Sequence, residues 1–462
     1  MNQHKFIRPW HIHVLFIDII ALSLTFYAVV SLLLTPDSLF NIDNIPSTEF
    51  AWMFLVYTVS FLITLLAVGL YNEKAAQTIN YIALRAGVAT ALALMLSASL
   101  YLLFPLNFWP AFSWVLLLGA GATTLILARI AIRPYYHRLQ RTRVAVVGTG
   151  KNAKMFKRLF RNRSSRIHFE LIGFLDIGDG QCADSIYSIG SVSDIEDIIK
   201  NKDIDELVIA LDDRRQSYPT DLLMDCRLNG INVIDINDFI EREVGMISIE
   251  QIKPCSFIYY KMGNNNLLMS FSSWLWNSFL ASIVFLTTWP ILLITVIAIK
   301  IEDGIHAPIF YRQTRTGISG KPFEIIKFRS MITDAEKNKA VMSTNGDPRI
   351  TKVGKFIRTY RIDELPQIIN VFKGQMNFVG PRPERPEFTD SFDERIPYYR
   401  VRTMVKPGLT GWAQLNYPYG DCIEDTIEKL KYDLYYLRHR RITFDIYILV
   451  NTCEVILFGK GR

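Results

Sequence analysis

The chain has 462 residues, of which 50% are apolar and 21% charged, and its formal net charge is +7. At about 150 residues per domain this length predicts about three domains, so a small protein held together by disulfides or a metal is excluded. The apolar content excludes a disordered chain. The positive balance favours anionic partners such as nucleic acid, acidic lipid headgroups or phosphorylated substrates. The 5 cysteines are scattered and form no C-x-x-C, which argues against a disulfide framework or a zinc site and fits a reducing compartment.

Apolar stretches of about 20 residues occupy the first third of the chain, and each is long enough to cross a hydrocarbon core of about 30 Å. They are Val14 to Leu34, Phe50 to Leu70, Tyr81 to Leu103 and Trp109 to Ile132. The first lacks a small-residue cleavage site and is too long for a signal-peptide core, so we expect it to be retained rather than cleaved. The sequence therefore predicts an amino-terminal membrane domain.

The basic residues beside these stretches set the orientation, because Lys and Arg are held on the cytoplasmic side. Lys5 and Arg8 precede the first stretch, Lys74 lies between the second and third, and a run of arginines follows the fourth. The loops 35–49 and 104–108 contain no Lys or Arg. Both ends of this domain are therefore expected in the cytoplasm.

A fifth apolar stretch, Phe271 to Ile299, contains Pro290. Proline in a helix interior removes a hydrogen bond and clashes with the preceding turn, so a kink is expected. Local sequence leaves two interpretations open, a kinked spanning helix and a broken helix that returns to the side it entered from.

Between the membrane stretches, Val144 to Gly148 is a β-branched run that leads into the pattern G-T-G-K-N-A. Further strand patterns follow at His168 to Leu175, Glu206 to Ala210 and Ile231 to Ile236, with helical patterns at Lys151 to Phe160, Val192 to Lys200 and Thr220 to Leu228. A glycine turn after a strand, followed by alternating strands and helices, is typical of a Rossmann-like parallel sheet. Gly148 and Gly150 are then candidate cofactor-binding residues, and Asp176, after the second strand, is a candidate for a ribose. The alternative is a scaffold or regulatory domain.

The carboxy-terminal third carries basic residues on a strand-turn-strand pattern from Ile309 to Met331. They suit phosphate oxygens, although anionic lipid is an equal alternative. The set includes Arg312, Arg315, Lys321, Lys327 and Arg329.

Asp363 and Glu364 open a predicted short helix that ends near Gly374, and Arg361 stands just before them. A carboxylate pair at a helix start beside arginines suits phosphoryl transfer, since one carboxylate can attack phosphorus or bind Mg²⁺. On the pair alone, these residues could equally cap the helix.

Arg382 stands between two prolines in GPRPERP, which suggests a rigid clamp for phosphate or nucleotide, with a structural ion pair as the alternative. Further on, Gln414 lies in a glycine-rich turn region. The last stretch, rich in Tyr and Leu beside basic residues, is amphipathic and predicts either a membrane-surface helix or packing against the core.

The motifs KFRSM, DELPQ-x-x-NV-x-KG, GPRP and KPGLTGWAQ occur here in order. With them, the chain from about Lys300 to the end resembles the monotopic phosphoglycosyl transferases, the bacterial sugar transferases that start glycan synthesis on a polyprenyl carrier. The YPYG and EKLKYDLYYL stretches are most similar to the exopolysaccharide subgroup.

The resemblance implies that Asp363 attacks a UDP-sugar, that UMP leaves, and that the sugar phosphate passes to undecaprenyl phosphate. Glu364 and Mg²⁺ would support the charge, with the metal on both carboxylates. UDP-glucose or UDP-galactose is the usual donor of the large members. The family pattern also implies substrate-binding roles for Lys327, Arg329, Arg361, Arg382 and Gln414.

The resemblance completes the predicted architecture, membrane α plus α/β. We expect a four-helix transmembrane bundle (1–135), a Rossmann-like cytoplasmic domain (143–245), a re-entrant membrane helix (265–300) and a small α/β catalytic domain (301–462). The chain would reside in the bacterial inner membrane with its catalytic domain facing the cytoplasm. The oligomer is not fixed by the sequence, a homodimer being one arrangement.

The sequence departs from the family pattern in the re-entrant helix, where the usual basic pair and acid are replaced by Ser273-Trp274 and Asn277 and the break is Trp289-Pro290. Competing hypotheses are a transferase acting within its membrane helices and a membrane regulator that senses a nucleotide through the Rossmann-like domain. A nucleic-acid binder is disfavoured, because the basic residues alternate with acids and membrane stretches dominate.

Overall fold

The computed structural model divides into two units, one formed by residues 1–136 and 261–462 and the other by His137–Tyr260. It describes residues 9–33, 47–71, 79–103, 111–138, 142–161, 169–176, 188–212, 219–249, 267–332, 347, 349–418, 420 and 422–457. Lys5, Arg8 and Lys74, which set the predicted orientation, lie outside these residues, as does most of the loops 35–49 and 104–108.

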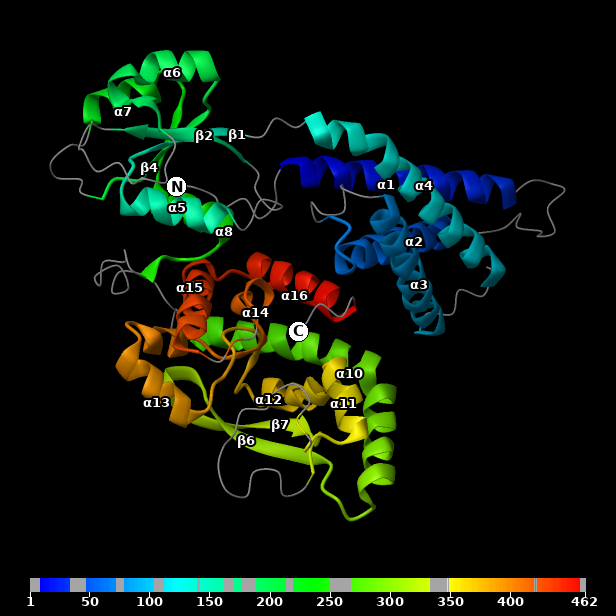
Figure 1. Ribbon diagram of the computed structural model, residues 1–462. Coiled ribbons are helices and arrows are strands. Elements are labelled where there is room, and N and C mark those ends of the chain that lie inside the picture. The colour runs from blue at the N-terminus through cyan, green and yellow to red at the C-terminus, as the bar shows by residue number, and fades with distance from the viewer. Residues whose placement is uncertain are drawn as a thin grey trace. The chain divides into compact units, whose positions relative to one another are not determined.

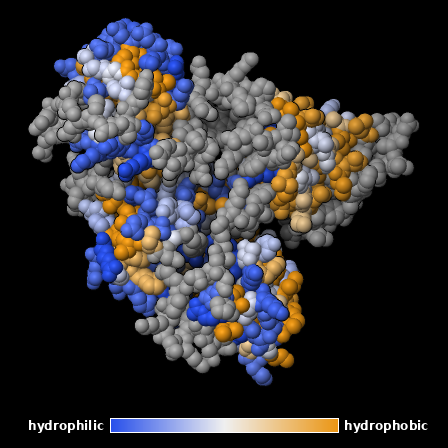
Figure 2. All heavy atoms as spheres, viewed as in Figure 1, coloured by the Kyte–Doolittle hydropathy of each residue, from blue (hydrophilic) through white to orange (hydrophobic). Residues whose placement is uncertain are grey.

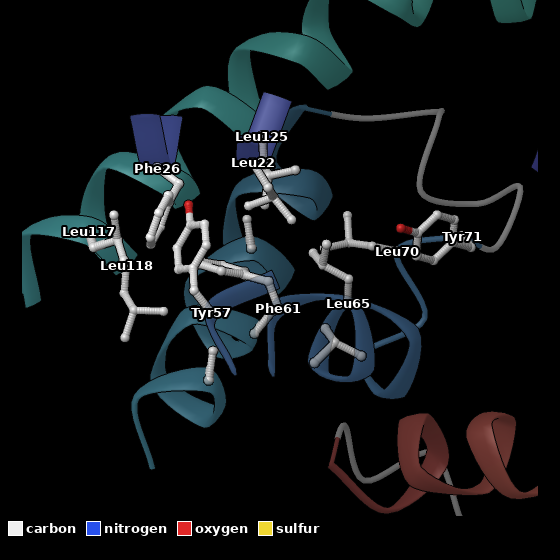
Figure 3. Packing of buried hydrophobic residues seen from close by; sticks show 14 of the residues in the cluster. Leu22, Phe26, Tyr57, Phe61, Leu65, Leu70, Tyr71, Leu117, Leu118 and Leu125 are labelled. Atoms are coloured by element: carbon white, nitrogen blue, oxygen red, sulfur yellow. The ribbon is translucent and has the colours of Figure 1, made fainter. Parts of the chain in front are cut away.

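In the first unit, four apolar helices share one core (Figure 3). They are α1 (Pro9–Leu33), α2 (Ser47–Ala67), α3 (Ile79–Leu103) and α4 (Ala111–Arg138). Aromatic rings hold its centre: Phe26 meets Tyr57 with ring centroids 5.8 Å apart, and Tyr57 meets Phe61 at 5.4 Å. These rings point toward Leu117 and Leu118 of α4 (Figure 3), so the helices bury apolar side chains against one another.

Three described helical stretches are long and apolar enough to cross a membrane: His13–Leu32, Phe50–Ala67 and Ser270–Asp303. The helices α3 and α4 contribute shorter apolar stretches, Ile82–Ser97 and Val115–Ala131. Apolar side chains gather on the surface over α1 to α4, where Figure 2 is orange. The expected apolar helices are therefore present, and their outer faces suit lipid rather than water.

Two ion pairs are buried among these helices. Asp18 of α1 binds Arg129 of α4 (Oδ2–Nη2 2.5 Å) and accepts a hydrogen bond from Tyr71 at 2.7 Å. Arg85 of α3 binds Glu454 near the carboxy terminus (Nη2–Oε1 2.7 Å) and donates to the Val68 carbonyl oxygen. Such residues are costly in an apolar surrounding unless paired, and these pairs tie together segments far apart in the chain.

The second unit is a five-stranded parallel sheet in the order β3-β2-β1-β4-β5. Its strands are β1 (Thr142–Val147), β2 (Phe169–Asp176), β3 (Ser188–Ser191), β4 (Glu206–Ile209) and β5 (Asn232–Asp235). Its helices are α5 (Lys151–Arg161), α6 (Ile195–Lys202), α7 (Thr220–Leu228) and α8 (Ile236–Val244), with a 3₁₀ turn at Val192–Asp194. This confirms the predicted parallel α/β sheet, to which the structure adds β3 as an edge strand.

The rest of the first unit begins with α10 (Leu267–Asp303), which contains Pro290 and bends along its length in Figure 1. An antiparallel hairpin follows, β6 (Phe310–Thr316) with β7 (Pro322–Phe328), as the sequence predicts. The other elements are α11 (Lys352–Thr359), η6 (Ile362–Gln367), α12 (Ile368–Phe372), β8 (Asn377–Val379), α13 (Pro386–Arg395), η7 (Tyr399–Met404), β9 (Gly408–Thr410), α14 (Trp412–Asn416), α15 (Ile423–His439) and α16 (Ile442–Leu457).

The atypical residues of α10 bind its neighbours. Trp274 donates to the carbonyl oxygen of Phe372 (3.0 Å), and buried Asn277 accepts from the backbone N–H of Phe378 (2.7 Å). At the far end, the carboxylate of Glu302 accepts the backbone N–H groups of Lys352 and Val353 at the start of α11. Both ends of α10 are thus fastened to the part of the fold that carries Asp363.

The amphipathic tail of the sequence forms α15 and α16. Residues 430–437 of α15 are all buried, and α15 packs on α14. Of the two alternatives for this stretch, the structure favours packing against the core for α15. His439 lies at its end, and its ring contacts that of Tyr435 in a tilted arrangement, with 4.6 Å between the ring centroids.

Candidate active site

Asp363 and Glu364 lie on the 3₁₀ helix η6, which the chain enters through Arg361. Arg361 has φ +58°, a left-handed conformation that is unfavourable for a residue with a Cβ and that clusters at functional sites. Buried Asn370 of α12 ties this segment to β7, because its amide accepts from the N–H of Ile326 (3.1 Å) and donates to the Glu324 carbonyl oxygen (2.6 Å). The carboxylates are therefore presented by a strained turn held against the hairpin.

Three cations surround Glu364. The Nζ of Lys327 lies 3.0 Å from Oε1, the Nη2 of Arg382 lies 3.2 Å from the same oxygen, and the Nη1 of Arg361 lies 3.3 Å from Oε2. Four residues that the sequence singles out thus meet at one point, although they are up to 55 positions apart in the chain (382 minus 327).

The two carboxylates differ electrostatically. Burial opposes ionisation of Glu364, but the charges of Lys327, Arg382 and Arg361 outweigh it and hold the pKa of Glu364 well below its usual range. Burial, and then the negative charge of Glu364, raise the pKa of Asp363 above its ordinary value against the pull of nearby cations. Neighbouring carboxylates with pKa values pushed apart are a mark of functional sites.

Asp363 is 8% exposed, and no described group donates a hydrogen bond to its carboxylate. The capping alternative requires the opposite, because a helix-capping carboxylate accepts backbone N–H groups. Neither Asp363 nor Glu364 accepts such a bond within the described part of the chain. A buried carboxylate with free lone pairs beside several cations is chemically suited to attack an electrophilic phosphorus.

Arg382 also lines a narrow, open pocket between the hairpin, α13 and η7. Its backbone carbonyl accepts from the Nη2 of Arg402 (3.0 Å), and Arg402 also binds Asp433 of α15 (Nη2–Oδ2 2.9 Å) and the hydroxyl of Tyr399 (2.7 Å). Arg402 and Asp433 are almost fully buried. This network fixes the proline-flanked turn that aims Arg382 at Glu364.

The remaining sequence candidates lie apart from this cluster. Arg329 is buried and binds Asp303 at the end of α10 (Nη2–Oδ2 2.6 Å), while its Nε and Nη1 have no partner among the described residues. Gln414 lies on α14, half-buried, and no described contact joins it to Glu364. Neither residue therefore joins the group of charges around Glu364.

For Mg²⁺, the donor set is small. No group of three or more His, Cys, Asp or Glu side chains suited to a metal occurs among the described residues. Mg²⁺ is commonly held by one or two carboxylates together with substrate phosphates and water. Asp363 and Glu364 fit that pattern, so a site shared between the protein and a phosphorylated substrate is compatible with these residues.

In the second unit, Gly148 and Gly150 form the turn between β1 and α5. Gly148 has φ +119°, and a Cβ there would lie 2.8 Å from the carbonyl oxygen of Ala210. A Cβ at Gly150 would collide with the carboxylate of Asp212. Both glycines are therefore required by close contacts within this unit.

Sequence reasoning missed Asp303, Arg402 and Asp433, each of which holds a site residue in place. Asp303 carried a usable signal, because an acid that follows a long apolar helix must face water or a cation. The pairing of Arg402 with Asp433 had none, since it depends on how α15 packs.

The chain is similar to known proteins over much of its length. Residues 269–459 match the family described as bacterial sugar transferase, and residues 66–236 match the description CoA-binding domain. Over 74% of its length the chain is 30% identical to a UDP-glucose:undecaprenyl-phosphate glucose-1-phosphate transferase of Xanthomonas campestris pv. campestris, covering 72% of that protein.

A protein of the same description from Klebsiella pneumoniae is 31% identical over 76% of this chain and 75% of its own length. A UDP-N-acetylgalactosamine-undecaprenyl-phosphate N-acetylgalactosaminephosphotransferase of Aeromonas hydrophila is 43% identical, but over only 37% of this chain and 40% of its own. The matches to the first two proteins extend well beyond the motif region, and three of the four motifs contribute residues to the carboxylate pair and its cations. The chain therefore belongs to the bacterial sugar transferase family.

Proposed function

We propose that this enzyme transfers a hexose 1-phosphate from a UDP-sugar to undecaprenyl phosphate, as a first membrane step of exopolysaccharide or capsule synthesis. The names of the relatives support the reaction, and UDP-glucose is the donor named for those that align over the greatest length. The observation that carries the proposal is the buried, unbonded carboxylate of Asp363 beside a Glu364 held ionised by three cations.

In the first step, a carboxylate oxygen of Asp363 attacks the β-phosphorus of the UDP-sugar. The bond from that phosphorus to the oxygen bridging the two phosphates breaks, and UMP leaves. In the second step, a phosphate oxygen of undecaprenyl phosphate attacks the same phosphorus, the bond to Asp363 breaks, and the carboxylate is regenerated. Splitting the transfer in this way keeps the sugar phosphate on the protein between two substrates.

The cations have separate tasks. Lys327 and Arg361 hold Glu364 and offset the charge that builds up on the transferred phosphoryl group. Arg382 binds Glu364 and lines the narrow pocket beside it, which suits it to a phosphate of the diphosphate, while contact with the uridine is implied by the family pattern alone. The Nε and Nη1 of Arg329 are buried and have no partner among the described residues, so a role toward the lipid phosphate, like that of Gln414, rests on the family pattern.

Mg²⁺, held by Asp363 and Glu364 with substrate oxygens, would neutralise charge on the diphosphate. The cations around Glu364 leave Asp363 the freer of these two carboxylates.

The bend of α10 and its apolar surface support a re-entrant helix that dips into the inner membrane and leaves the catalytic part on the cytoplasmic side, where UDP-sugars occur. The apolar helices α1 to α4 would form a four-helix transmembrane bundle in the lipid bilayer. Association of two copies remains a prediction from the sequence.

The test is UMP release by the purified protein with Mg²⁺, undecaprenyl phosphate and a panel of UDP-sugars, for the wild type and Asp363→Asn. We expect release with one sugar and a loss of at least about 10³-fold in the variant, because the amide is not a nucleophile. Undiminished release by Asp363→Asn would refute the assignment of the nucleophile. Absence of release with every sugar, by folded protein, would refute the reaction.

A further inference from the structure

The glycine turn of the second unit stands where Rossmann-like folds bind a diphosphate. Such binding needs free backbone N–H groups at the start of the helix, because they and the helix dipole hold the phosphate oxygens. Here the helix is α5, which has 11 residues and follows Gly150 directly. The family description for this region implies coenzyme A, whose diphosphate would need the same groups.

These N–H groups are already bonded to a carboxylate of the chain itself. Asp212, which follows β4, accepts the N–H of Lys151 with Oδ2 at 2.6 Å and the N–H of Asn152 with Oδ1 at 2.8 Å. Both carboxylate oxygens are used, in the two-pronged way in which a phosphate group would bind. Gly150 leaves the room for them, since its missing Cβ would overlap Asp212.

Neighbouring contacts hold this arrangement. The side chain of Asn152 donates to the carbonyl oxygen of Leu211 (2.9 Å), which ties α5 to the residue before Asp212. Asp176, the candidate for a ribose, accepts a hydrogen bond from Thr149 at 3.3 Å. The turn therefore satisfies internally both polar groups that a dinucleotide would use.

We propose that Asp212 is a built-in anion that closes the glycine turn, so that this domain takes neither coenzyme A nor a dinucleotide diphosphate there. A phosphate would have to displace a carboxylate and would meet its negative charge if it did not. Gly150 is then required by Asp212 rather than by a ligand, and the residues at the turn do not fit coenzyme A. The proposal is independent of the transferase reaction.

The experiment is amide hydrogen exchange of the full-length protein in detergent, followed in peptides that cover 148–154, with Asp212→Ala as the variant. We expect exchange there to accelerate about tenfold in the variant, because the first amides of α5 lose their acceptor. Pyrophosphate at 10 mM should restore protection in Asp212→Ala, while neither pyrophosphate nor coenzyme A changes the wild type. Sodium chloride at matched ionic strength controls for screening.

Asp235→Ala is the matched control, because Asp235 also caps a helix in this unit, accepting the N–H of Asn237 at 2.9 Å. Exchange at the start of α8 should accelerate, and pyrophosphate should not restore it. Asp212→Asn, which keeps the shape and removes the charge, serves if the alanine variant does not fold. Protection of the wild-type turn by coenzyme A or pyrophosphate would overturn the proposal, and so would a folded Asp212 variant that pyrophosphate leaves unprotected.

Discussion

Two carboxylates of this chain lie beside the start of a helical segment, and their surroundings are opposite. Asp212 is exposed and accepts two backbone N–H groups of α5. Asp363 is buried on η6, accepts no hydrogen bond from the described residues, and has a raised pKa because burial disfavours its charge. The comparison teaches that a carboxylate with satisfied lone pairs stabilises its turn, whereas one left unsatisfied destabilises it and stays available for chemistry.

The largest effect that would sharpen this contrast is expected for Glu364→Gln. Removing the charge that balances three cations should lower UMP release by about 10²–10³-fold, as for loss of one electrostatic stabiliser at a reaction centre. Glu387→Gln, an exposed glutamate on α13, is the control and should leave the rate unchanged.

The same variant should also be less stable than the wild type at neutral pH. Because the pKa of Glu364 is depressed in the folded state, its contribution is present above its ordinary value of 4.5 and is lost as the pH falls through the folded value. Thermal unfolding of both proteins from pH 7 to well below pH 4.5 measures this. If the difference in stability between the wild type and Glu364→Gln grew as the pH fell, the predicted direction of the pH dependence would be wrong.

Next in size is Arg402→Lys. Lysine keeps the charge but cannot bind Asp433, the Tyr399 hydroxyl and the Arg382 carbonyl together. We expect kcat/KM for the UDP-sugar to fall about 10- to 100-fold, mainly through KM, as the Arg382 turn loosens. Arg400→Lys, at an exposed position of the same segment, is the control; an equal loss there would contradict the positioning role.

A smaller effect is expected on the pH dependence of Lys327→Met. Asp363 must be ionised to attack, and Lys327 lowers its pKa against burial and the charge of Glu364. Removing that cation should raise the pKa further, so the acid limb of the pH–rate profile should move to higher pH. Lys321→Met, on the turn of the same hairpin, should leave it in place, and a shift of the Lys327→Met limb to lower pH would contradict the account.

The smallest effect is on the stability of Asp363→Asn. The pKa of Asp363 is raised on folding, so the wild type loses stability as the pH rises from the ordinary value of 3.8 through the folded value. The neutral amide escapes that loss. At pH 7 the inactive variant should be as stable as the wild type or more stable, by on the order of 1 kcal/mol per unit of pKa shift, and a clearly lower melting temperature would break the contrast with Asp212.

The sequence located the elements of the second unit well, because their signals are local. The β-branched run before Gly148 and the strand patterns after it correspond to β1, β2, β4 and β5 within a residue or two. The strand β3 was missed, since Ser188–Ser191 is short, contains a glycine and pairs only at the sheet edge. The helix patterns likewise located α5, α6 and α7, but they do not predict which groups the helix ends contact.

In the candidate active site, the sequence motifs singled out Asp363, Glu364 and Arg382. They could not show that Lys327 and Arg382 bind the same oxygen of Glu364. That depends on Asn370 fastening α12 to the hairpin. The sequence could have placed Asp212 near the glycine turn, because Asp212 follows a parallel strand and the carboxyl ends of such strands meet at one edge of the sheet. The sequence could not predict that the Asp212 side chain points at the N–H of Asn152, because the two residues are 60 positions apart in the chain.

The pair Arg85 and Glu454 bears on how such enzymes are assembled from modules. In this chain, excising the amino-terminal helices would strip Glu454 of its cation and uncover an acid on an apolar helix. A shortened protein without the amino-terminal helices should therefore carry a neutral residue at position 454. In evolution, gain or loss of those helices is expected to change positions 85 and 454 together.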